Sequence, residues 1–392
     1  NRYLKSSPNR SSEMYALAYY NLGYIAFHQK DYTTAESRFG SYIQLEKGEN
    51  PAALADACNR LGDCCLHARR FDEANRYYSR AESMGTASGD YSYYQMALVA
   101  GLQKNYSIKV DLLNRLAQKY PNSPYAVNGL YEKGRSYVQN QETANAIATF
   151  SELLSKYPDS PVARKAAAEI GLLYYQDDKY PEAIAAYKKV ISDYPGSEEA
   201  RQAQRDLRSI YIDLNQVDAY TQYASTIKGG IAVEAGERDS LTYVAAEKVY
   251  IRGDLDGAKT SFTRYLQQFP QGAFALNAHY YLGLIAYNRK DFATARQHLD
   301  KVIEYPNNEY SEEAIIMGAE IAFNDKDYAR ALTLYKLLKD KTASAERRQL
   351  AQVGILRCAY LTKNNEEVVL AAGDLLANSK LSPELANEAR YY

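Results

Sequence analysis

Cysteine and histidine are the side chains of this 392-residue chain that could hold a metal ion or act as a nucleophile. Cys64, Cys65 and His67 lie close together in sequence, but adjacent residues on a helix point about 100° apart, so the three do not converge easily on one ion. Cys58 and Cys65 are seven residues apart, on one face of a helix, which favours core packing. The sequence therefore predicts neither a metal site nor a disulfide framework. The complete set is Cys58, Cys64, Cys65, Cys358, His28, His67, His279 and His298.

Catalytic and phosphate-binding motifs are missing from the sequence. It contains no Gly-rich phosphate loop and no GxSxG, HExxH or CxxC pattern. The four histidines are scattered over three repeats, and His28 and His67 hold equivalent repeat positions, which favours a surface or groove-edge role. Acidic pairs such as Asp177-Asp178 and Glu312-Glu313 lie at turns or helix starts, where solvated charge is ordinary. We therefore expect a protein that is not an enzyme and that uses no cofactor.

Composition narrows the possible partners. The 47 basic residues nearly balance the 48 acidic ones, for a net charge of −1, and there is no polybasic run. Neither nucleic acid nor an anionic membrane surface is therefore an expected partner. The apolar stretches are too short for a transmembrane segment. The chain has 39 Tyr and no Trp. Tyr suits positions between helices where the ring is buried and the hydroxyl remains in contact with water.

The elements that would position these residues repeat along the chain. A small residue is followed twelve positions later by alanine, and Ala146 and Ala183, for example, lie 37 residues apart. A period of this length is typical of stacked helix pairs. The sequence therefore predicts an all-α, right-handed superhelical solenoid of about ten helix-turn-helix repeats. The small residues are Gly23, Gly62, Ala97, Gly134, Gly171, Ala246, Gly283 and Ala319, and the alanines are Ala35, Ala74, Ala146, Ala183, Ala258, Ala295 and Ala331.

The clearest repeat runs from residue 161 to 195. Its first helix is expected to turn Ala167, Ile170, Gly171 and Tyr174 inward, and its second helix Tyr180, Ala183, Tyr187 and Val190. Gly171 lacks a side chain, so another helix can approach its backbone closely. Ser-Pro pairs at 123–124, 160–161 and 382–383 predict an N-cap hydroxyl followed by Pro at the first helical position.

These features resemble the tetratricopeptide repeat family. The resemblance rests on the small residue, the alanine twelve positions on and the surrounding aromatics, and it covers nearly the whole chain. The period is near 37 residues where the family has 34, and the Trp that often opens the family's first helix is absent. The resemblance implies binding of a protein or peptide along a concave face lined by first helices. By repeat register that face includes Tyr20, Tyr24, Phe27, Asn59, Asp63, Leu66, Tyr131, Arg135, Leu172, Tyr175, Tyr243, Tyr250, Tyr280, Tyr287 and Phe323.

Two stacks of repeats are predicted. An N-terminal array of about six repeats covers residues 11–227, and a C-terminal array of about four covers 240–392. Between them, residues 228–239 fit no helix pattern well, and Gly229-Gly230 marks a break. Arg208 and Tyr220 replace both small residues of the sixth repeat, and the last repeat is also degenerate. Without a polar capping helix at its end, the chain is expected to be a piece of a longer protein.

The joints between repeats add a narrower resemblance. Tyr-Pro-x-Ser segments at 120–123, 157–160 and 194–197 are similar to the joints of bacterial envelope repeat proteins. The resemblance implies a periplasmic or outer-membrane-associated scaffold or adaptor, with a cytoplasmic location as the alternative. Two other functions stay open: a recruiting or sensor region of a larger enzyme or signalling protein, and a glycan-capturing outer-membrane lipoprotein. The partner's identity and the oligomeric state do not follow from the sequence.

Overall fold

Helices make up all the regular secondary structure in the described part of the chain. The computed structural model describes residues 2–6, 12–228, 233–305, 307–378 and 381–392. The chain divides into two compact units, Asn1–Leu207 (unit 1) and Arg208–Tyr392 (unit 2).

Unit 1 begins with the short helix α1 (Arg2–Ser6) and continues as five helix pairs. The pairs are α2 (Glu13–His28) with α3 (Tyr32–Leu45), α4 (Pro51–His67) with α5 (Phe71–Ser83), α6 (Gly89–Leu102) with α7 (Tyr106–Lys119), α8 (Ala126–Gln139) with α9 (Thr143–Lys156), and α10 (Ala163–Gln176) with α11 (Tyr180–Asp193).

The helix α12 (Glu198–Asp213) contains the boundary between the units and is followed by α13 (Val217–Ala224). Four helix pairs and the terminal helix α22 (Pro383–Tyr391) complete unit 2. The pairs are α14 (Ala235–Ile251) with α15 (Leu255–Gln268), α16 (Ala275–Asn288) with α17 (Phe292–Ile303), α18 (Ser311–Asn324) with α19 (Tyr328–Lys341), and α20 (Ala345–Leu361) with α21 (Asn365–Leu376).

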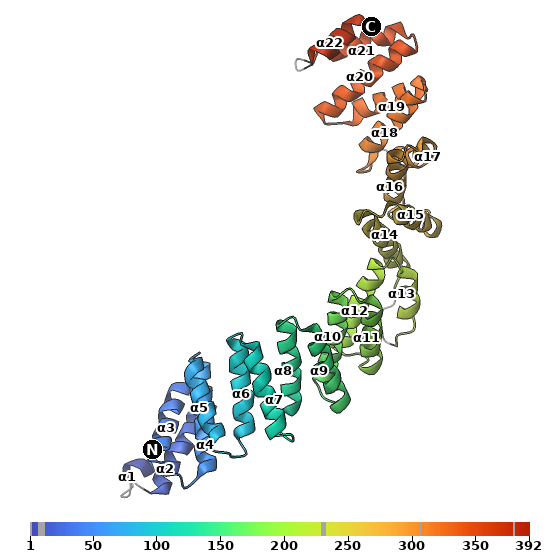
Figure 1. The fold of residues 1–392 in the computed structure, drawn as a ribbon. Helices are drawn as coiled ribbons and strands as arrows, with labels where there is room; N and C mark the ends of the chain where they lie inside the picture. Colours follow the sequence, from blue (N-terminus) through green and yellow to red (C-terminus); the bar gives the residue numbers. More distant parts are fainter. Residues whose placement is uncertain (1, 7–11, 229–232, 306, 379–380) are drawn as a thin grey trace. The chain divides into compact units, whose positions relative to one another are not determined.

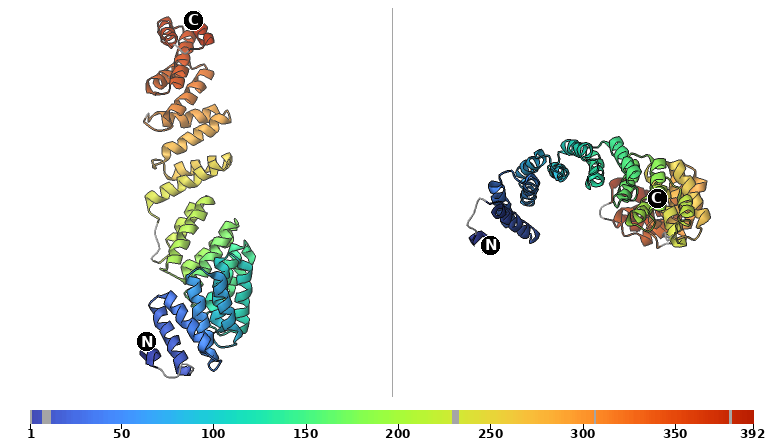
Figure 2. Two further views of the ribbon diagram at one scale, coloured as in Figure 1. Left: turned by 90° about the vertical axis from the view of Figure 1, so that its left-hand side faces the viewer. Right: turned by 90° about the horizontal axis from the view of Figure 1, so that it is seen from below.

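Within each unit the helices pack on their neighbours in the chain. Figure 1 shows α2 to α11 side by side in chain order, and the left view of Figure 2 shows α14 to α22 stacked in the same way. Contacts also join first helices of successive pairs, as between α4 and α6 and between α16 and α18. Because each pair touches only its near neighbours, this is an all-α repeat solenoid, as predicted.

The small residue of each repeat makes room for a side chain of the second helix. A Cβ added to Gly171 would lie 2.7 Å from the ring of Tyr187, sixteen residues further on. Gly23 is covered in the same way by Phe39, and Gly283 by Leu299, each at 2.8 Å from such a Cβ. The prediction that Gly171 permits a close approach is therefore confirmed, and the group that approaches is an aromatic ring.

The turn inside each pair holds one residue in the left-handed region. Nine of these residues are not glycine, and Gly253 (φ 84°) takes the position in the α14–α15 turn. Left-handed backbone costs a residue with a Cβ roughly 1–2 kcal/mol, so the packing of the two helices must hold each turn closed. The nine are Lys30, Arg69, Lys104, Gln141, Asp178, Asn215, Lys290, Lys326 and Lys363.

The predicted N-caps at Ser-Pro pairs are correct at only one of three places. Ser382 caps α22 and accepts a hydrogen bond from the Leu385 amide at 3.3 Å. At Ser123 and Ser160 the helices begin later, at Ala126 and Ala163. Their hydroxyls accept from the amide two residues on, which closes a turn before the helix.

The predicted irregular segment at 228–239 is shorter in the structure. The residues from Ala235 onward form the first turns of α14, and Asp239 is buried there. Its carboxylate accepts from the Tyr265 hydroxyl and the Ala273 amide. The Gly229-Gly230 break lies outside the described residues. The division into arrays at 11–227 and 240–392 stays a prediction about which parts fold by themselves.

None of the described helices is both long enough and apolar enough to cross a bilayer.

Candidate functional site

The predicted site residues lie on the first helices of the pairs. We call the surface of these helices the first-helix face; it is formed by α2, α4, α6, α8 and α10 in unit 1 and by α14, α16, α18 and α20 in unit 2. Each unit has its own part of this face.

Two tyrosines of α2 share one carboxylate of the next repeat. The hydroxyls of Tyr20 and Tyr24 both donate to Oδ2 of Asp56 on α4, the first at 2.8 Å. The two rings also meet edge to face and pack on the ring of Phe39. Burial and the Asp56 carboxylate raise the pKa of Tyr24 to about 12. Both side chains are half-buried, so their hydroxyls are occupied by the contact between the first two repeats.

A charged row follows one side of α4. Asp56, Arg60 and Asp63 are spaced at four and three residues, and the Arg60 guanidinium lies 2.6 Å from Asp63 and 3.8 Å from Asp56. Arg60 also lies over the rings of Phe27 and Tyr91, 5.6 and 4.6 Å from their centroids. The row carries two negative charges and one positive charge, so it holds one net negative charge.

Asp63 is buried, so the prediction that it lies open on the face is wrong. Its Oδ1 accepts from the Tyr78 and Tyr91 hydroxyls, each at 2.8 Å. Burial raises the pKa of this carboxyl, while Arg60 and the two hydroxyls oppose the rise. The tyrosines and the arginine therefore take the place of water around a buried charge.

Asn59 and Tyr243 are also buried, at 0% and 4% exposure, so neither faces a partner as predicted. The Asn59 amide donates to the Ser88 carbonyl and accepts from the Ser92 hydroxyl at 2.8 Å, which joins α4 to α6. The Tyr243 ring stacks on Phe274 with centroids 4.5 Å apart. Register placed these residues on the correct helices, but close packing between repeats covers them.

Tyr131, Arg135 and Tyr175 keep part of their surface open. Arg135 is exposed and lies 3.8 Å from Glu132 on its own helix. The Tyr131 ring packs 5.8 Å from Phe150, and the Tyr175 ring lies 6.0 Å from Tyr180. Tyr131 thus packs against the core, while Tyr175 packs on another half-buried ring.

An open groove of about 520 Å³ crosses the first-helix face of unit 1. Leu66, Leu98 and Leu102 supply apolar surface, and Leu102 is 60% exposed. Lys109 pairs with Glu132 inside the groove. We call this the unit 1 groove; its lining is Leu66, Leu98, Gly101, Leu102, Tyr106, Lys109, Glu132, Arg135, Ser136 and Gln139.

The predicted tyrosines Tyr250, Tyr280 and Tyr287 of unit 2 make ring contacts and one hydrogen bond between repeats. Tyr280 stacks on Tyr310 with centroids 4.3 Å apart, and Tyr250 packs 4.7 Å from Tyr281. Tyr287 donates a hydrogen bond to Glu320 of α18. These predicted residues are half-buried between successive first helices.

A second groove, of about 410 Å³, crosses the first-helix face of unit 2. Its apolar part includes Leu350, which is 39% exposed, and Arg357 on its edge binds Glu388 through two hydrogen bonds of 2.6 and 2.9 Å. We call this the unit 2 groove; its lining is Glu320, Phe323, Tyr335, Glu346, Gln349, Leu350, Val353, Gly354, Arg357 and Leu385.

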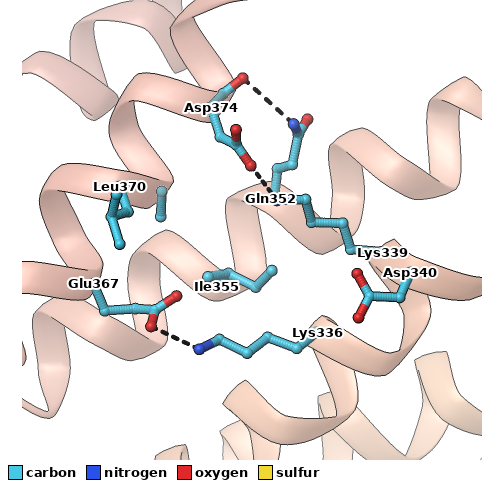
Figure 3. Close-up of a pocket in the computed structure, with 9 residues that line it drawn as sticks. Lys336, Lys339, Asp340, Gln352, Ile355, Glu367, Leu370 and Asp374 are labelled. Atoms are coloured by element: carbon cyan, nitrogen blue, oxygen red, sulfur yellow. Dashed lines mark hydrogen bonds and ion pairs between the residues drawn. The ribbon is translucent and has the colours of Figure 1, made fainter.

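A further pocket, of about 320 Å³, lies between the second helices α19 and α21 over α20 (Figure 3). Ion pairs bridge it, from Lys336 to Glu367 at 2.6 Å and from Lys339 to Asp374. Partly exposed pairs of this kind contribute little to stability or affinity. Most of the residues that line this pocket lie on second helices, and none of them is a predicted site residue.

Sequence reasoning missed four of the charged residues of unit 1 described above: Asp56, Arg60, Lys109 and Glu132. Lys109 stands where the repeat has alanine, and it is buried beside Gly101, whose missing Cβ leaves space for its stem. A lysine in a small-residue position was the available signal. Its partner Glu132 and the pair Asp56 and Arg60 could have been found only by placing neighbouring repeats against one another.

The described residues contain one group of three possible metal ligands, Glu36, Cys65 and Glu73. Arg70 already pairs with both carboxylates, at 2.6 and 2.8 Å. The Cys65 thiol is buried, and burial raises its pKa to about 11, which opposes the thiolate form that binds metals. The four cysteines are all free and buried, as the predicted core packing requires.

Helix pairs in tandem, small residues under large side chains of the second helices and open grooves on one set of helices define a solenoid repeat protein. Family comparison agrees with this class. Models described as tetratricopeptide repeat match residues 91–123, 131–198 and 250–309. These segments of the chain are therefore tetratricopeptide repeats.

Solved structures with similar folds are numerous but distant. YrrB, described as a tetratricopeptide repeat protein with an unusual peptide-binding site, is 17% identical, with 50% of this chain and 94% of that chain covered and a TM-score of 0.39. Naa15/Naa10 bound to HypK is 10% identical, with 95% and 65% covered and a TM-score of 0.42. The TPR2AB domain of yeast Sti1, in its complex with pHSP90, is 16% identical, with 71% and 100% covered and a TM-score of 0.34. No curated protein sequence matches.

Proposed function

We propose that this chain is a non-catalytic scaffold that binds a protein or peptide partner along its first-helix face. The observation that carries the proposal is the unit 1 groove, which is open, apolar on one side and charged on the other. Long shallow surfaces of this kind suit an extended or helical segment better than a small substrate.

The unit 1 groove favours a partner with an apolar side chain next to a carboxylate. Leu66, Leu98 and Leu102 offer the apolar surface, and an exposed Leu gains from being covered. Lys109 and Arg135 contribute two positive charges against the single carboxylate of Glu132. An incoming acidic group would therefore complete the charge balance, and Arg135 is placed to bind it in a bidentate manner.

The tyrosines extend this surface toward α10. Tyr131 lies on α8 with Arg135, Tyr175 lies on the next first helix, α10, and Tyr and Arg are enriched at the residues that dominate binding energy. Asn59, Asp63 and Tyr243 are left out of the proposed surface because they are buried. The other predicted residues are half-buried and pack against neighbouring aromatic rings; they are Tyr20, Tyr24, Phe27, Tyr250, Tyr280 and Tyr287.

A peptide library displayed on phage tests the proposal. Peptides selected on the wild-type chain should contain an apolar residue beside Asp or Glu. Replacing both Tyr131 and Tyr175 by Ala should weaken the best peptide more than about tenfold, because each such truncation is typically worth about 2 kcal/mol or more. Ile108→Ala, an exposed position on the second helix α7, is the matched control and should leave affinity unchanged.

Melting temperature measured on the same samples separates binding from stability. A folded double variant with lost affinity supports the surface. Affinity within about twofold of wild type would remove the two tyrosines from it, since that difference is under half a kcal/mol. Failure to select any peptide sequence preference would contradict the proposed function.

We also propose a bacterial envelope location, on the strength of the Tyr-Pro-x-Ser joints. In the structure the joint tyrosines Tyr120, Tyr157 and Tyr194 end the second helices α7, α9 and α11 as C-cap residues. The joint therefore has a structural role in any compartment. Fractionation of cells expressing the full gene product decides the location, and recovery in the cytoplasm would contradict the proposal.

A further inference from the structure

Two histidines on different helices of one pair, His279 and His298, lie in contact with each other. His279 of α16 and His298 of α17 place their Nδ1 atoms 2.9 Å apart, with ring centroids 5.2 Å apart. At this distance one Nδ1 donates a hydrogen bond and the other accepts it. Both rings are half-buried between the two helices.

The repeat itself shows that packing does not require imidazoles here. His279 lies four residues before the small residue Gly283, and His298 lies three residues after Ala295. In the fifth repeat the same two positions hold Ala167 and Ala186. In the ninth they hold Ile315 and Leu334, which belong to one apolar cluster. Small or aliphatic side chains therefore satisfy the fold at these positions, and the histidine pair is a departure specific to this repeat.

The surroundings keep the pair neutral. Burial, and then the neighbouring His298, lower the pKa of His279 to about 4, and burial also lowers the pKa of His298. Lys259 of α15 and Lys301 of α17 add to this effect, while Glu304 opposes it and pairs with Lys301 at 3.1 Å. Neutral imidazole is the form that ligates transition metals.

We propose that His279 and His298 form a binding site for a late first-row divalent cation such as Zn²⁺, Ni²⁺ or Cu²⁺. Tetrahedral Zn²⁺ with Zn–N bonds of about 2.0–2.1 Å sets two nitrogen ligands about 3.3 Å apart. The Nδ1 atoms are at 2.9 Å, so they need to separate by about 0.4 Å, and each ring must turn by about 35° to point its lone pair at a tetrahedral ion. A rotation about χ2, which is a broad torsion for His, supplies this movement.

The proton balance of binding is simple. In the metal-free pair the shared proton lies on one Nδ1, and that ring's Nε2 is free. On binding, this proton moves to Nε2 of the same ring, so both Nδ1 lone pairs face the ion and both rings stay neutral. No third Cys, His, Asp or Glu ligand of the described residues lies within reach of the pair. Water or a partner's side chain fills the remaining positions, as at open zinc sites.

The ligand type predicts which metals bind. Imidazole nitrogens favour Cu²⁺ over Ni²⁺ and Zn²⁺, and these over Mn²⁺. Mg²⁺ and Ca²⁺ require oxygen ligands and should not bind. Two ligands from different helices of one pair also mean that the bound ion cross-links α16 to α17, so unit 2 should melt at a higher temperature when the ion is present.

Titration calorimetry of the whole chain with Zn²⁺, and Cu²⁺ spectroscopy in parallel, tests the site. The variant His279→Ile with His298→Leu copies the pair of the ninth repeat, so it should fold. The control variant His28→Gln with His67→Gln changes the other two histidines, which are exposed and lie in unit 1. Circular dichroism of both variants checks that they are folded.

Wild type and the control should bind one Zn²⁺ with the same affinity and gain the same melting temperature. The His279→Ile, His298→Leu variant should bind at least about tenfold more weakly, because even a change in a residue that only supports a metal ligand typically costs about that much. Nitrogen hyperfine coupling from two imidazoles should appear with Cu²⁺ in wild type and vanish in this variant. Absence of Zn²⁺ and Cu²⁺ binding to wild type, or binding that survives in the variant, would overturn the proposal.

Discussion

The first-helix faces of the two units are built from the same aromatic residue but use it differently. In unit 1, hydroxyls converge on charge: Tyr20 and Tyr24 on Asp56, and Tyr78 and Tyr91 on Asp63. In unit 2, a carboxylate accepts from a single tyrosine, as Glu320 does from Tyr287, and rings stack on rings, as Tyr280 does on Tyr310.

The difference shows what the repeat fixes and what it leaves free. The small residue and the side chain sixteen positions later set the distance between paired helices in both units. The remaining positions of the two helices can then hold a buried charge network, a stacked aromatic pair or two histidines without changing the helix pair itself. The following predictions test this distinction between a common core and variable faces.

The largest effect is expected at the common core. Gly171→Leu should destabilise unit 1 by several kcal/mol, because overpacking costs about 1–3 kcal/mol even in milder cases and the ring of Tyr187 leaves no room. Gly283→Leu in unit 2 should cost less, since the overlying Leu299 is a flexible aliphatic side chain. Denaturant unfolding measures both. An unchanged melting curve for Gly171→Leu would refute the assigned register.

The next effect separates the two faces. Arg60→Ala should cost about 3–5 kcal/mol, the usual loss when one partner of a buried ion pair is removed, because its side chain and that of Asp63 are only 17% and 9% exposed. Arg357→Ala in unit 2 should cost under about 1 kcal/mol, since its pair with Glu388 is a surface pair. Similar losses for both arginines would show that the Asp63 network is no more buried than a surface pair.

Acid should weaken the two units unequally. Arg347 lowers the pKa of Glu312, and Arg357 lowers that of Glu388. A carboxyl whose pKa is lower in the folded state gives stability that is lost as pH falls through the unfolded and then the folded pKa. Burial raises the pKa of Asp63 in unit 1, so its folded form holds a proton more readily and its contribution improves as pH falls.

Pepsin digestion between pH about 5 and 3 measures this difference, since these values span the ordinary carboxyl pKa range. Cleavage sites identified by mass spectrometry should appear within 208–392 before they appear within 12–207. Earlier cleavage in unit 1 would mean that the carboxyls with lowered pKa do not dominate the acid response.

The smallest effect concerns the turns, which both units share. Lys290→Gly should stabilise the chain by about 0.5 kcal/mol, because relief of left-handed strain is partly offset by the entropy of glycine. Gly253→Lys, at the equivalent turn, should destabilise by about 1 kcal/mol for the opposite reason. Differential scanning calorimetry resolves the two shifts. Changes of the same sign would contradict the shared turn conformation.

The fold could be predicted because the core pattern is local and repeated. Gly171, Ala183 and Tyr187 recur at fixed spacing, so a single repeat defines the packing of all the others. The N-caps at Ser123 and Ser160 were predicted incorrectly because a hydroxyl before Pro can close a turn as well as cap a helix. The first turns of α14 were missed because Gly236 and Asp239 weaken its helix pattern, while the buried hydrogen bonds of Asp239 come from distant Tyr265 and Ala273.

The candidate site was less predictable. Repeat register correctly places Tyr131, Arg135 and Tyr175 on first helices. It cannot tell which of the residues on a first helix is covered by the next repeat, and Asn59, Asp63 and Tyr243 are covered. The contacts of His279 with His298 and of Lys109 with Glu132 depend on side chains that depart from the repeat, so no periodic pattern indicates them.

A hydrogen-exchange footprint of a bound peptide tests the central claim most directly. The claim is that partners bind the first helices and leave the second helices free. With a selected peptide at saturation, backbone amides of α6 and α8, which line the unit 1 groove, should gain protection, and those of α7 and α9 away from the groove should exchange as in the free chain. Protection confined to second helices, or spread evenly over the unit, would contradict the claim.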